Sequence, residues 1–384
     1  MKVFFLIDST FSERDFIRFG IDAFIRDNIQ VYLWSFSDLR GDTVSELGFE
    51  ENLYHKQVNY FIFTDFKELG EKIKEIDKAF LIDQRSALYK KYTTCWFKDN
   101  GAIIVKLDQG LLPVSIWTPS TRDKLIILRN FFINYGFYKI ISKLVKYFFR
   151  HFRNSECCSI KVCSGSASKC DNGVFEIQSH ALDYDIYLQE KDKEKNSENY
   201  IVFLDNGMVG HPDYYKLNIP NYCTKEVYYP LLRSFFNKIE EKTGLSIIVS
   251  LHPRLLITDD LVYQYGNRRL ILGKTAELVR DAELVLAHDT TAINFVALWS
   301  IPLVIITTNQ IERAIYASME ATTQILKTTR ININDSYDDI DFLEIAQRPI
   351  PQYDNFVENF IKVSGSSIQN SALILIKGLK KYKQ

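Results

Sequence analysis

The stretch Ser250-Leu251-His252-Pro253-Arg254, together with the later stretch His288-Asp289-Thr290-Thr291-Ala292, decides the fold class of this 384-residue chain. Each stretch directly follows an apolar run rich in β-branched residues, which is typical of a buried strand that ends in polar residues. Parallel α/β sheets bind their ligands at such strand ends. Two of these strand ends in one part of the chain therefore predict an α/β domain that binds a ligand carrying phosphate.

The sequence around both stretches alternates between predicted strands and predicted helices. In this half we expect strands at 200–204, 245–251, 270–272, 283–287 and 302–307, and helices ending near 243 and at 276–280 and 291–299. In the first half we expect strands at 2–7, 30–36, 60–64, 78–82, 102–107, 160–163 and 175–179, and helices at 12–26 and 66–76. Such alternation predicts two parallel, doubly wound sheets.

The domain organisation follows from a polar stretch, 189–199, that is rich in lysine and glutamate and typical of an exposed linker. We expect an N-terminal Rossmann-like domain over 1–192 and a C-terminal Rossmann-like domain over 193–350. The segment 351–384 carries apolar residues at helical spacing. We expect it to form C-terminal helices, one of which packs back on the first domain.

The composition indicates a globular protein, with 46% hydrophobic and 25% charged residues. A formal net charge of -1 excludes a general attraction to nucleic acid. The apolar run at the start ends at Asp8, too early for a signal peptide, so we expect a cytoplasmic protein. The six cysteines do not show the paired spacing of a zinc site, so we expect no metal and no cofactor.

One local segment, 121–153, is rich in basic and aromatic residues and predicts helices of its own. Its candidate contacts to an acceptor or a membrane are Lys139, Lys143, Lys146 and Arg150. Basic residues interleaved with aromatic ones suit attachment to an anionic membrane surface. This indicates a peripheral position on the cytoplasmic, inner face of a membrane. A helix pair packed in the core, with a solvated basic face, is an equally open interpretation.

The candidate phosphate-binding residues follow the strand ends. Pro253 stops a strand and holds His252 at the edge of the sheet, and Arg254 can bind a phosphate in a bidentate manner. Hydroxyl groups at the start of a helix suit an anion, although they also serve as helix caps. The remaining candidates are Lys274, Thr275, His288, Asp289, Thr290 and Thr291.

The candidate catalytic residues are carboxylates close to these strand ends, together with one histidine. Asp205 follows the run 200–204 and can act as a general base or nucleophile, although an aspartate capping a turn is as common. His180 precedes an Asp-x-Asp pair, Asp183 and Asp185. Such a pair can hold a divalent metal. Because the pair lies outside the half of the chain that carries the phosphate-binding candidates, we expect a positioning or catalytic role without metal.

Four segments resemble a known family when read in order: HALDYDIYL (180–188), YIVFLDNGMVGHPDYY (200–215), YYPLLRSFFNKIEEKTGLSIIVSLHPR (228–254) and GKTAELVRDAELVLAHDTTAINFVALWSIPLVII (273–306). They resemble bacterial glycosyltransferases of capsule, O-antigen and lipopolysaccharide assembly that use CMP-activated sugars. The retaining β-Kdo transferases match best, and sialyltransferases and polysialyltransferases match more distantly. The resemblance implies the GT-B fold, in which two Rossmann-like domains face a cleft.

The resemblance also implies roles for single residues. His252 and either Thr290 or Thr291 would contact the CMP phosphate, with help from Arg254 and Lys274. The second domain would hold the nucleotide-sugar donor, and the first would hold a glycan or lipid-linked glycan acceptor. Transfer would be metal-independent. A carboxylate would act as the nucleophile, with Asp205 the first candidate and Asp183 the second.

Three alternatives stay open. An inverting transferase of the CMP-sialic-acid type would carry a short acidic-glycine motif in the first domain, and no clear copy is found there. A UDP-N-acetylhexosamine 2-epimerase would share the fold, but it would have no use for the basic and aromatic helices of 121–153. A non-enzymatic, peripheral membrane component of a capsule-assembly complex would depend on that segment alone.

Overall fold

The computed structural model describes residues 1–7, 13–36, 58–85, 94, 96–113, 158–168, 173–211, 223–311, 313–347 and 353–384. The predicted membrane or acceptor contacts Lys139, Lys143, Lys146 and Arg150 lie outside these residues. No helix in the described part of the chain is both long enough and apolar enough to cross a membrane.

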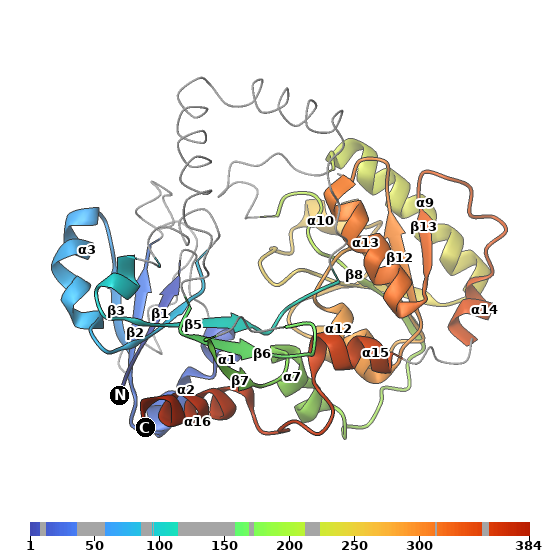
Figure 1. Ribbon diagram of the computed structural model, residues 1–384. Helices are drawn as coiled ribbons and strands as arrows, with labels where there is room; N and C mark the ends of the chain where they lie inside the picture. The colour runs from blue at the N-terminus through green and yellow to red at the C-terminus, as the bar shows by residue number, and fades with distance from the viewer. Residues whose placement is uncertain are drawn as a thin grey trace, which may run out of the picture.

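The first sheet has seven parallel strands in the order β3-β2-β1-β4-β5-β6-β7 (Figure 1). The strands are β1 (Lys2–Ile7), β2 (Gln30–Ser35), β3 (Asn59–Ile62), β4 (Phe80–Asp83), β5 (Ile103–Asp108), β6 (Ile160–Cys163) and β7 (Phe175–Gln178). Its helices are α1 (Glu13–Arg18), α2 (Ile21–Arg26) and α3 (Phe66–Lys72), and α3 continues as a 3-10 turn, Ile73–Ile76. The strand order reverses between β1 and β4, as in a doubly wound sheet.

The core of this domain lies on both faces of the sheet. In β1, Val3, Phe5 and Ile7 belong to the cluster formed with α2 and the C-terminal helix, and Phe4 and Leu6 belong to a second cluster on the other face. Successive side chains of a strand point to opposite faces. A continuous apolar run is therefore what a sheet buried on both faces requires.

The predicted helix 12–26 is two helices, α1 and α2, in the structure. Gly20 separates them with a φ of 59°, a left-handed conformation that glycine adopts without a steric penalty. A Cβ added at Gly20 would lie 2.3 Å from the Cβ of Ala372 in the C-terminal helix. The helix pattern alone did not reveal this close approach.

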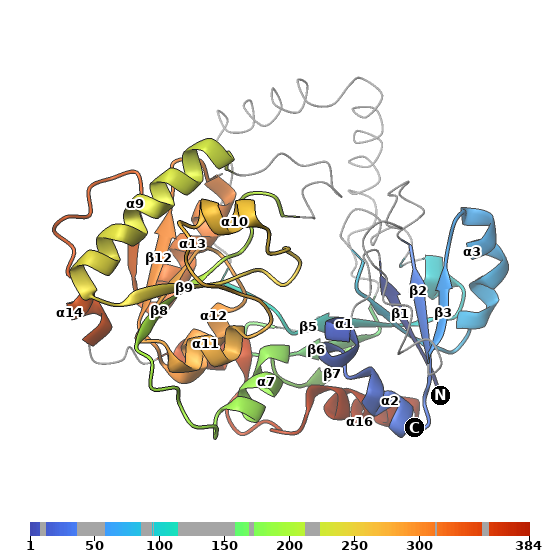
Figure 2. The same ribbon diagram turned by 180° about the vertical axis from the view of Figure 1, so that it is seen from behind.

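The second sheet has six parallel strands in the order β10-β9-β8-β11-β12-β13 (Figure 2). The strands are β8 (Tyr200–Leu204), β9 (Ser246–Ser250), β10 (Leu270–Ile271), β11 (Leu284–Ala287), β12 (Leu303–Thr307) and β13 (Thr329–Asn332). The helices are α9 (Lys225–Thr243), α10 (Asp259–Gln264), α11 (Thr275–Asp281), α12 (Ile293–Trp299), α13 (Arg313–Leu326) and α14 (Phe342–Gln347). The strand order reverses between β8 and β11.

The chain passes from the first sheet to the second and later returns. The outgoing and the returning segments are hydrogen-bonded to each other. On the way out, α7 (Leu182–Glu190) packs against α11 and α12 of the second sheet. On the way back come α15 (Asp354–Phe356), a π-helical turn (Val357–Ile361) and α16 (Ser371–Lys383), which packs on α2 and β7 (Figures 1 and 2). The amide of Ala181 donates to the carbonyl of Ile361 at 2.7 Å. The predicted return of a C-terminal helix to the first domain is confirmed.

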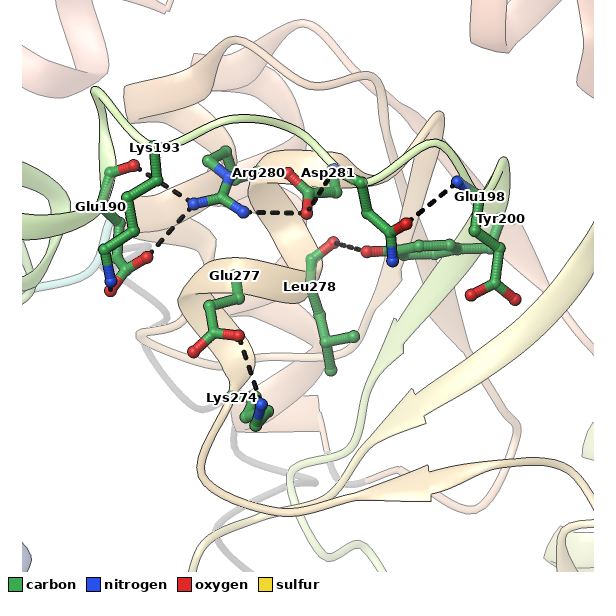
Figure 3. A network of polar contacts seen from close by, with 10 residues as sticks. Glu190, Lys193, Glu198, Tyr200, Lys274, Glu277, Leu278, Arg280 and Asp281 are labelled. Carbon is green, nitrogen blue, oxygen red and sulfur yellow. Dashed lines mark hydrogen bonds and ion pairs between the residues drawn. The ribbon is translucent and has the colours of Figure 1, made fainter.

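A polar network attaches the predicted linker to the second sheet (Figure 3). Arg280 in α11 donates to Glu190 at the end of α7, at 3.2 Å, and to Asp281, at 2.6 Å. The amide of Asn196 donates to Asp281, and the Tyr200 hydroxyl donates to the carbonyl of Leu278. The predicted domain boundary at 192 and 193 lies in this segment, between β7 and β8.

Candidate functional site

The site begins where β8 and β9 end side by side. Leu204 pairs with Ser250, and the amide of Asp205 donates to the carbonyl of Ser250 at 3.0 Å. Asp205 Oδ1 then accepts from the amide of Gly207 at 2.9 Å, which turns the chain sharply after the strand. Gly207 has a φ of 71°, so glycine suits this turn.

The rings of two histidines contact each other beside this turn. The Nε2 atoms of His211 and His252 lie 3.4 Å apart, and the ring centroids lie 4.4 Å apart. A Cβ at Gly207 would lie 2.9 Å from Cδ2 of His211, so the absence of a side chain there makes room for the ring. The Arg254 amide donates to Nδ1 of His252 at 3.3 Å. Both rings are half-buried, and Pro253 and Arg254 are exposed.

The sequence patterns alone predicted no role for His211. The signal that could have found it is the dipeptide His211-Pro212, which follows β8 just as His252-Pro253 follows β9. In both places a histidine and a proline come shortly after an apolar strand. Only the pairing of β8 with β9 shows that the two imidazoles meet.

Asp205 is buried, with 6% of the residue exposed. Burial raises the pKa of its carboxyl to about 6, against the lowering effect of the hydrogen bonds from the Gly207 amide and the Tyr265 side chain. The carboxyl therefore changes its charge close to neutral pH. A group of this kind can act as a base or a nucleophile, once a reacting atom reaches it.

The predicted phosphate contact of His288 does not agree with the structure. Its Nδ1 lies 2.7 Å from the carbonyl oxygen of Ile306, and its Nε2 lies 2.7 Å from the Tyr228 hydroxyl. The carbonyl only accepts, so Nδ1 carries the proton and Nε2 accepts from Tyr228. The ring is fully buried, which lowers the pKa of His288 to about 4 and keeps it neutral. His288 is therefore a buried core residue, and both of its ring nitrogens are hydrogen-bonded within the protein.

The three residues after His288 are more exposed. The carbonyl of Asp289 accepts from the side-chain amide of Asn206 at 3.0 Å, so the loops after β8 and β11 are tied together. Asp289 Oδ1 accepts from the Ser318 hydroxyl at 3.2 Å, and burial raises the pKa of this carboxyl. Thr290 Oγ1 accepts from the amide of Ala292 at 3.3 Å, and Thr291 is exposed.

The predicted pair Lys274 and Thr275 lies at the next strand end, after β10. The Thr275 hydroxyl is 2.9 Å from the Ser250 hydroxyl at the end of β9. Lys274 is exposed, and its Nζ lies 3.5 Å from the Glu277 carboxylate. Thr275 is thus joined to the end of β9, and Lys274 lies at the surface beside it.

Asp183 and His180 lie at the crossing between the sheets. Asp183 Oδ2 accepts from the side-chain amide of Asn294 in α12 at 2.9 Å, which links α7 to the helix after β11. His180 is fully buried, and its ring nitrogens lie 3.1 Å from the carbonyl of Ala181 and 2.8 Å from the carbonyl of Gln369. The predicted catalytic role of His180 does not agree with this position, because both nitrogens face backbone carbonyls in the interior.

The structure therefore brings one set of predicted residues together at the point where the second sheet reverses. The loops after β9, β8 and β11, which are neighbours in the sheet, carry Arg254, His252, Asp205 and Asp289. This is the position at which doubly wound sheets bind ligands. Among the described residues, no group of three or more His, Cys, Asp or Glu side chains could hold a metal ion.

Comparisons with known proteins identify the fold. The sequence matches no protein-family model and no curated protein. The structure is similar to the glycotransferase of kitacinnamycin, with 8% identity, a TM-score of 0.51, and 98% of each chain covered. It is also similar to MnaA of S. aureus solved with UDP, with 11% identity, a TM-score of 0.50, and 100% of this chain and 97% of that chain covered. With its two parallel Rossmann-like sheets and its returning C-terminal helix, the chain has the GT-B fold.

Proposed function

We propose that the chain is a glycosyltransferase that takes its sugar from a nucleotide-activated donor bound at the ends of β8, β9 and β11. The observation that carries this proposal is the convergence of His211, His252 and Arg254 beside Asp205, where the strand order reverses. The fold supports it, because the glycotransferase of kitacinnamycin and the UDP-bound MnaA share it.

CMP is the proposed nucleotide and Kdo the proposed sugar, with a lipid-linked or oligosaccharide acceptor of bacterial surface polysaccharide. Bond cleavage in a CMP-sugar leaves negative charge on a single phosphate. His252 and Arg254 can stabilise that charge without a metal ion. A UDP-sugar carries two phosphates and therefore more negative charge to balance, and Arg254 and Lys274 are the cations that follow β9 and β10 directly.

The proposed mechanism is retaining, with a carboxylate as nucleophile. Asp205 is the first candidate, because it ends β8 at the centre of the site. Its pKa of about 6 leaves it ionised above that pH. Because Asp205 is buried, a sugar can reach it only after the surrounding residues move. Asp183 is the second candidate, because it is more exposed and is oriented by Asn294.

The test is to incubate the full chain with CMP-Kdo, CMP-sialic acid or UDP-GlcNAc, together with a glycan acceptor, and to measure free nucleotide. We expect CMP release from CMP-Kdo. Release from CMP-sialic acid alone would change the sugar but keep the nucleotide. The absence of CMP release from either CMP-sugar would contradict the proposal. UDP release would favour a UDP-sugar enzyme, which is the second candidate because MnaA was solved with UDP.

Variants connect the activity to the site. We expect Arg254→Ala to lower kcat/KM by about 10- to 100-fold, the usual cost of a lost charge-assisted contact. Arg269→Ala is the matched control, because this exposed arginine pairs with Glu198 beside β10 and should leave activity unchanged. Asp205→Asn and Asp183→Asn separate the two carboxylates. Intact-protein mass after incubation with donor would reveal a glycosyl adduct, which only the nucleophile's variant should lose.

A further inference from the structure

The contacts of His252 with Arg254 and His211 indicate where the ring protons lie. The Arg254 amide can only donate, so the Nδ1 of His252 that it faces is an acceptor. The single proton of a neutral His252 is therefore on Nε2. That atom lies 3.4 Å from Nε2 of His211, so His252 donates and His211 accepts. In this arrangement both rings are neutral.

A proton added to Nε2 of His211 would break this contact, because two N–H groups would then point at each other. An anionic oxygen beside the pair removes the conflict, since it lies within hydrogen-bond reach of both Nε2 atoms and accepts from each. Anion entry and proton uptake therefore favour each other at this place.

We propose that His211 and His252 form a proton-linked site for one phosphate group of the donor nucleotide, in which His211 takes up a proton from solvent as the phosphate binds. The inference rests on the proposed nucleotide donor and adds to it a residue, His211, and a linkage. In the structure the two rings contact each other through their Nε2 atoms. In the bound state the phosphate oxygen takes the place of that contact.

The charged groups on the surrounding loops have opposite effects on the protonation of His211. Asp205 lies on the same loop as His211, and Asp289 lies on the loop after β11, which Asn206 ties to it. An ionised carboxylate at either position would favour a charged imidazole. Arg254 on the loop after β9 opposes it. Lys274, after β10, is partly neutralised by Glu277. The incoming phosphate adds negative charge to this set, which favours protonation of His211.

The experiment is calorimetric titration of the full chain with CMP near neutral pH, in two buffers that differ in their heat of ionisation. We expect an uptake of about one proton per CMP bound. Ring resonances of labelled histidines are followed in parallel. The His211 and His252 signals should titrate at higher pH when CMP is present. His180 and His288, whose ring nitrogens face partners in the core, are internal controls that should not respond.

The variant His211→Gln keeps an amide donor but cannot take up a proton. We expect it to bind CMP about tenfold more weakly, as one lost charge-assisted contact predicts, and without proton uptake. If the variant fails to fold, the titration of the wild-type histidine resonances with and without CMP tests the inference. CMP binding without proton uptake and without a response of His211 would overturn the inference and leave the proposed function standing.

Inorganic phosphate is the second probe, and it separates the two proposals. A shift of the His211 and His252 titrations by phosphate, in a chain that binds no nucleotide, would support the anion site and contradict the nucleotide donor. If neither CMP nor phosphate moved either titration, the anion site would be excluded.

Discussion

His252 and His288 follow buried strands in the same way, yet their side chains have different environments. β9 ends at Ser250, before Pro253, and the His252 ring is half-buried against His211. His288 is turned inward, where the Tyr228 hydroxyl and the Ile306 carbonyl satisfy both of its nitrogens. A buried polar group that lacked these partners would be costly. The available hydrogen-bond partners therefore separate a candidate ligand-binding histidine from a core histidine.

Asp205→Asn should change stability in a pH-dependent way. Burial raises the pKa of Asp205 from 3.8 to about 6, so the folded chain binds this proton more tightly than the unfolded chain does. The stabilisation by the protonated carboxyl is present below the unfolded value and is lost as the pH rises through about 6.

Asparagine, which stays neutral, should therefore raise the free energy of unfolding above that pH by up to about 3 kcal/mol, and change it little in acid. Urea denaturation at both pH values measures the difference. An equal effect at both would contradict the assigned cause.

The contact between α16 and β7 depends on a glycine. A Cβ added at Gly378 would lie 2.4 Å from Cδ1 of Ile177, so the helix and the strand approach more closely than any other residue would permit. Gly20 has the same function beside Ala372, between α1 and α2. Both contacts join the end of the chain to the first sheet. The residues next to each glycine in the sequence do not show that a close contact requires glycine there.

Gly378→Ala should destabilise the chain by about 1–3 kcal/mol, the usual cost of overpacking. The double variant Gly378→Ala, Ile177→Val should recover part of this loss, because it removes the clashing methyl group. Gly70→Ala in α3 is the matched control, since nothing lies within 4 Å of its added Cβ. That change should stabilise helix α3 by about 0.5–1 kcal/mol. Thermal unfolding of the four proteins would show whether Gly378 differs from Gly70.

The molecule consists of two sheets whose connections cross between them at one place. His180 and Lys362 form an antiparallel bridge there, and Asp185 accepts from the amide of Ser371 at the start of α16. The last helix thus completes the core of the first domain, although about 190 residues separate it from β7 in the sequence.

Removal of residues 371–384 should therefore loosen the first domain more than the second. Without α16, the apolar side chains of α2, β4 and β7 that it covers would meet water. Hydrogen exchange measured by mass spectrometry should show faster exchange in β1, β2 and β7, and unchanged protection in β8, β9 and β11. A chain that lacks only Gln384 is the control. Equal loss of protection in both sheets would show instead that they unfold as one unit.

Much of the fold can be predicted from local patterns. The strands 2–7, 160–163 and 200–204 match the structure, because apolar runs bounded by polar residues have few alternatives in an alternating chain. The strand β13 (Thr329–Asn332) was not predicted, because its alternating Thr, Arg, Ile and Asn lack an apolar run. At the site, the sequence could predict that polar residues follow β8, β9 and β11. It could not predict which side chains point inward.

The sequence by itself determined the two doubly wound sheets, since strand and helix periodicity depend on neighbours a few residues apart. Only the tertiary structure decided that His211 meets His252, that His288 and His180 are buried, and that Gly20 and Gly378 make room for α16. These properties depend on strand order and on contacts between segments far apart in the chain. A single sequence shows the residues that make such contacts, but not which of them lie side by side.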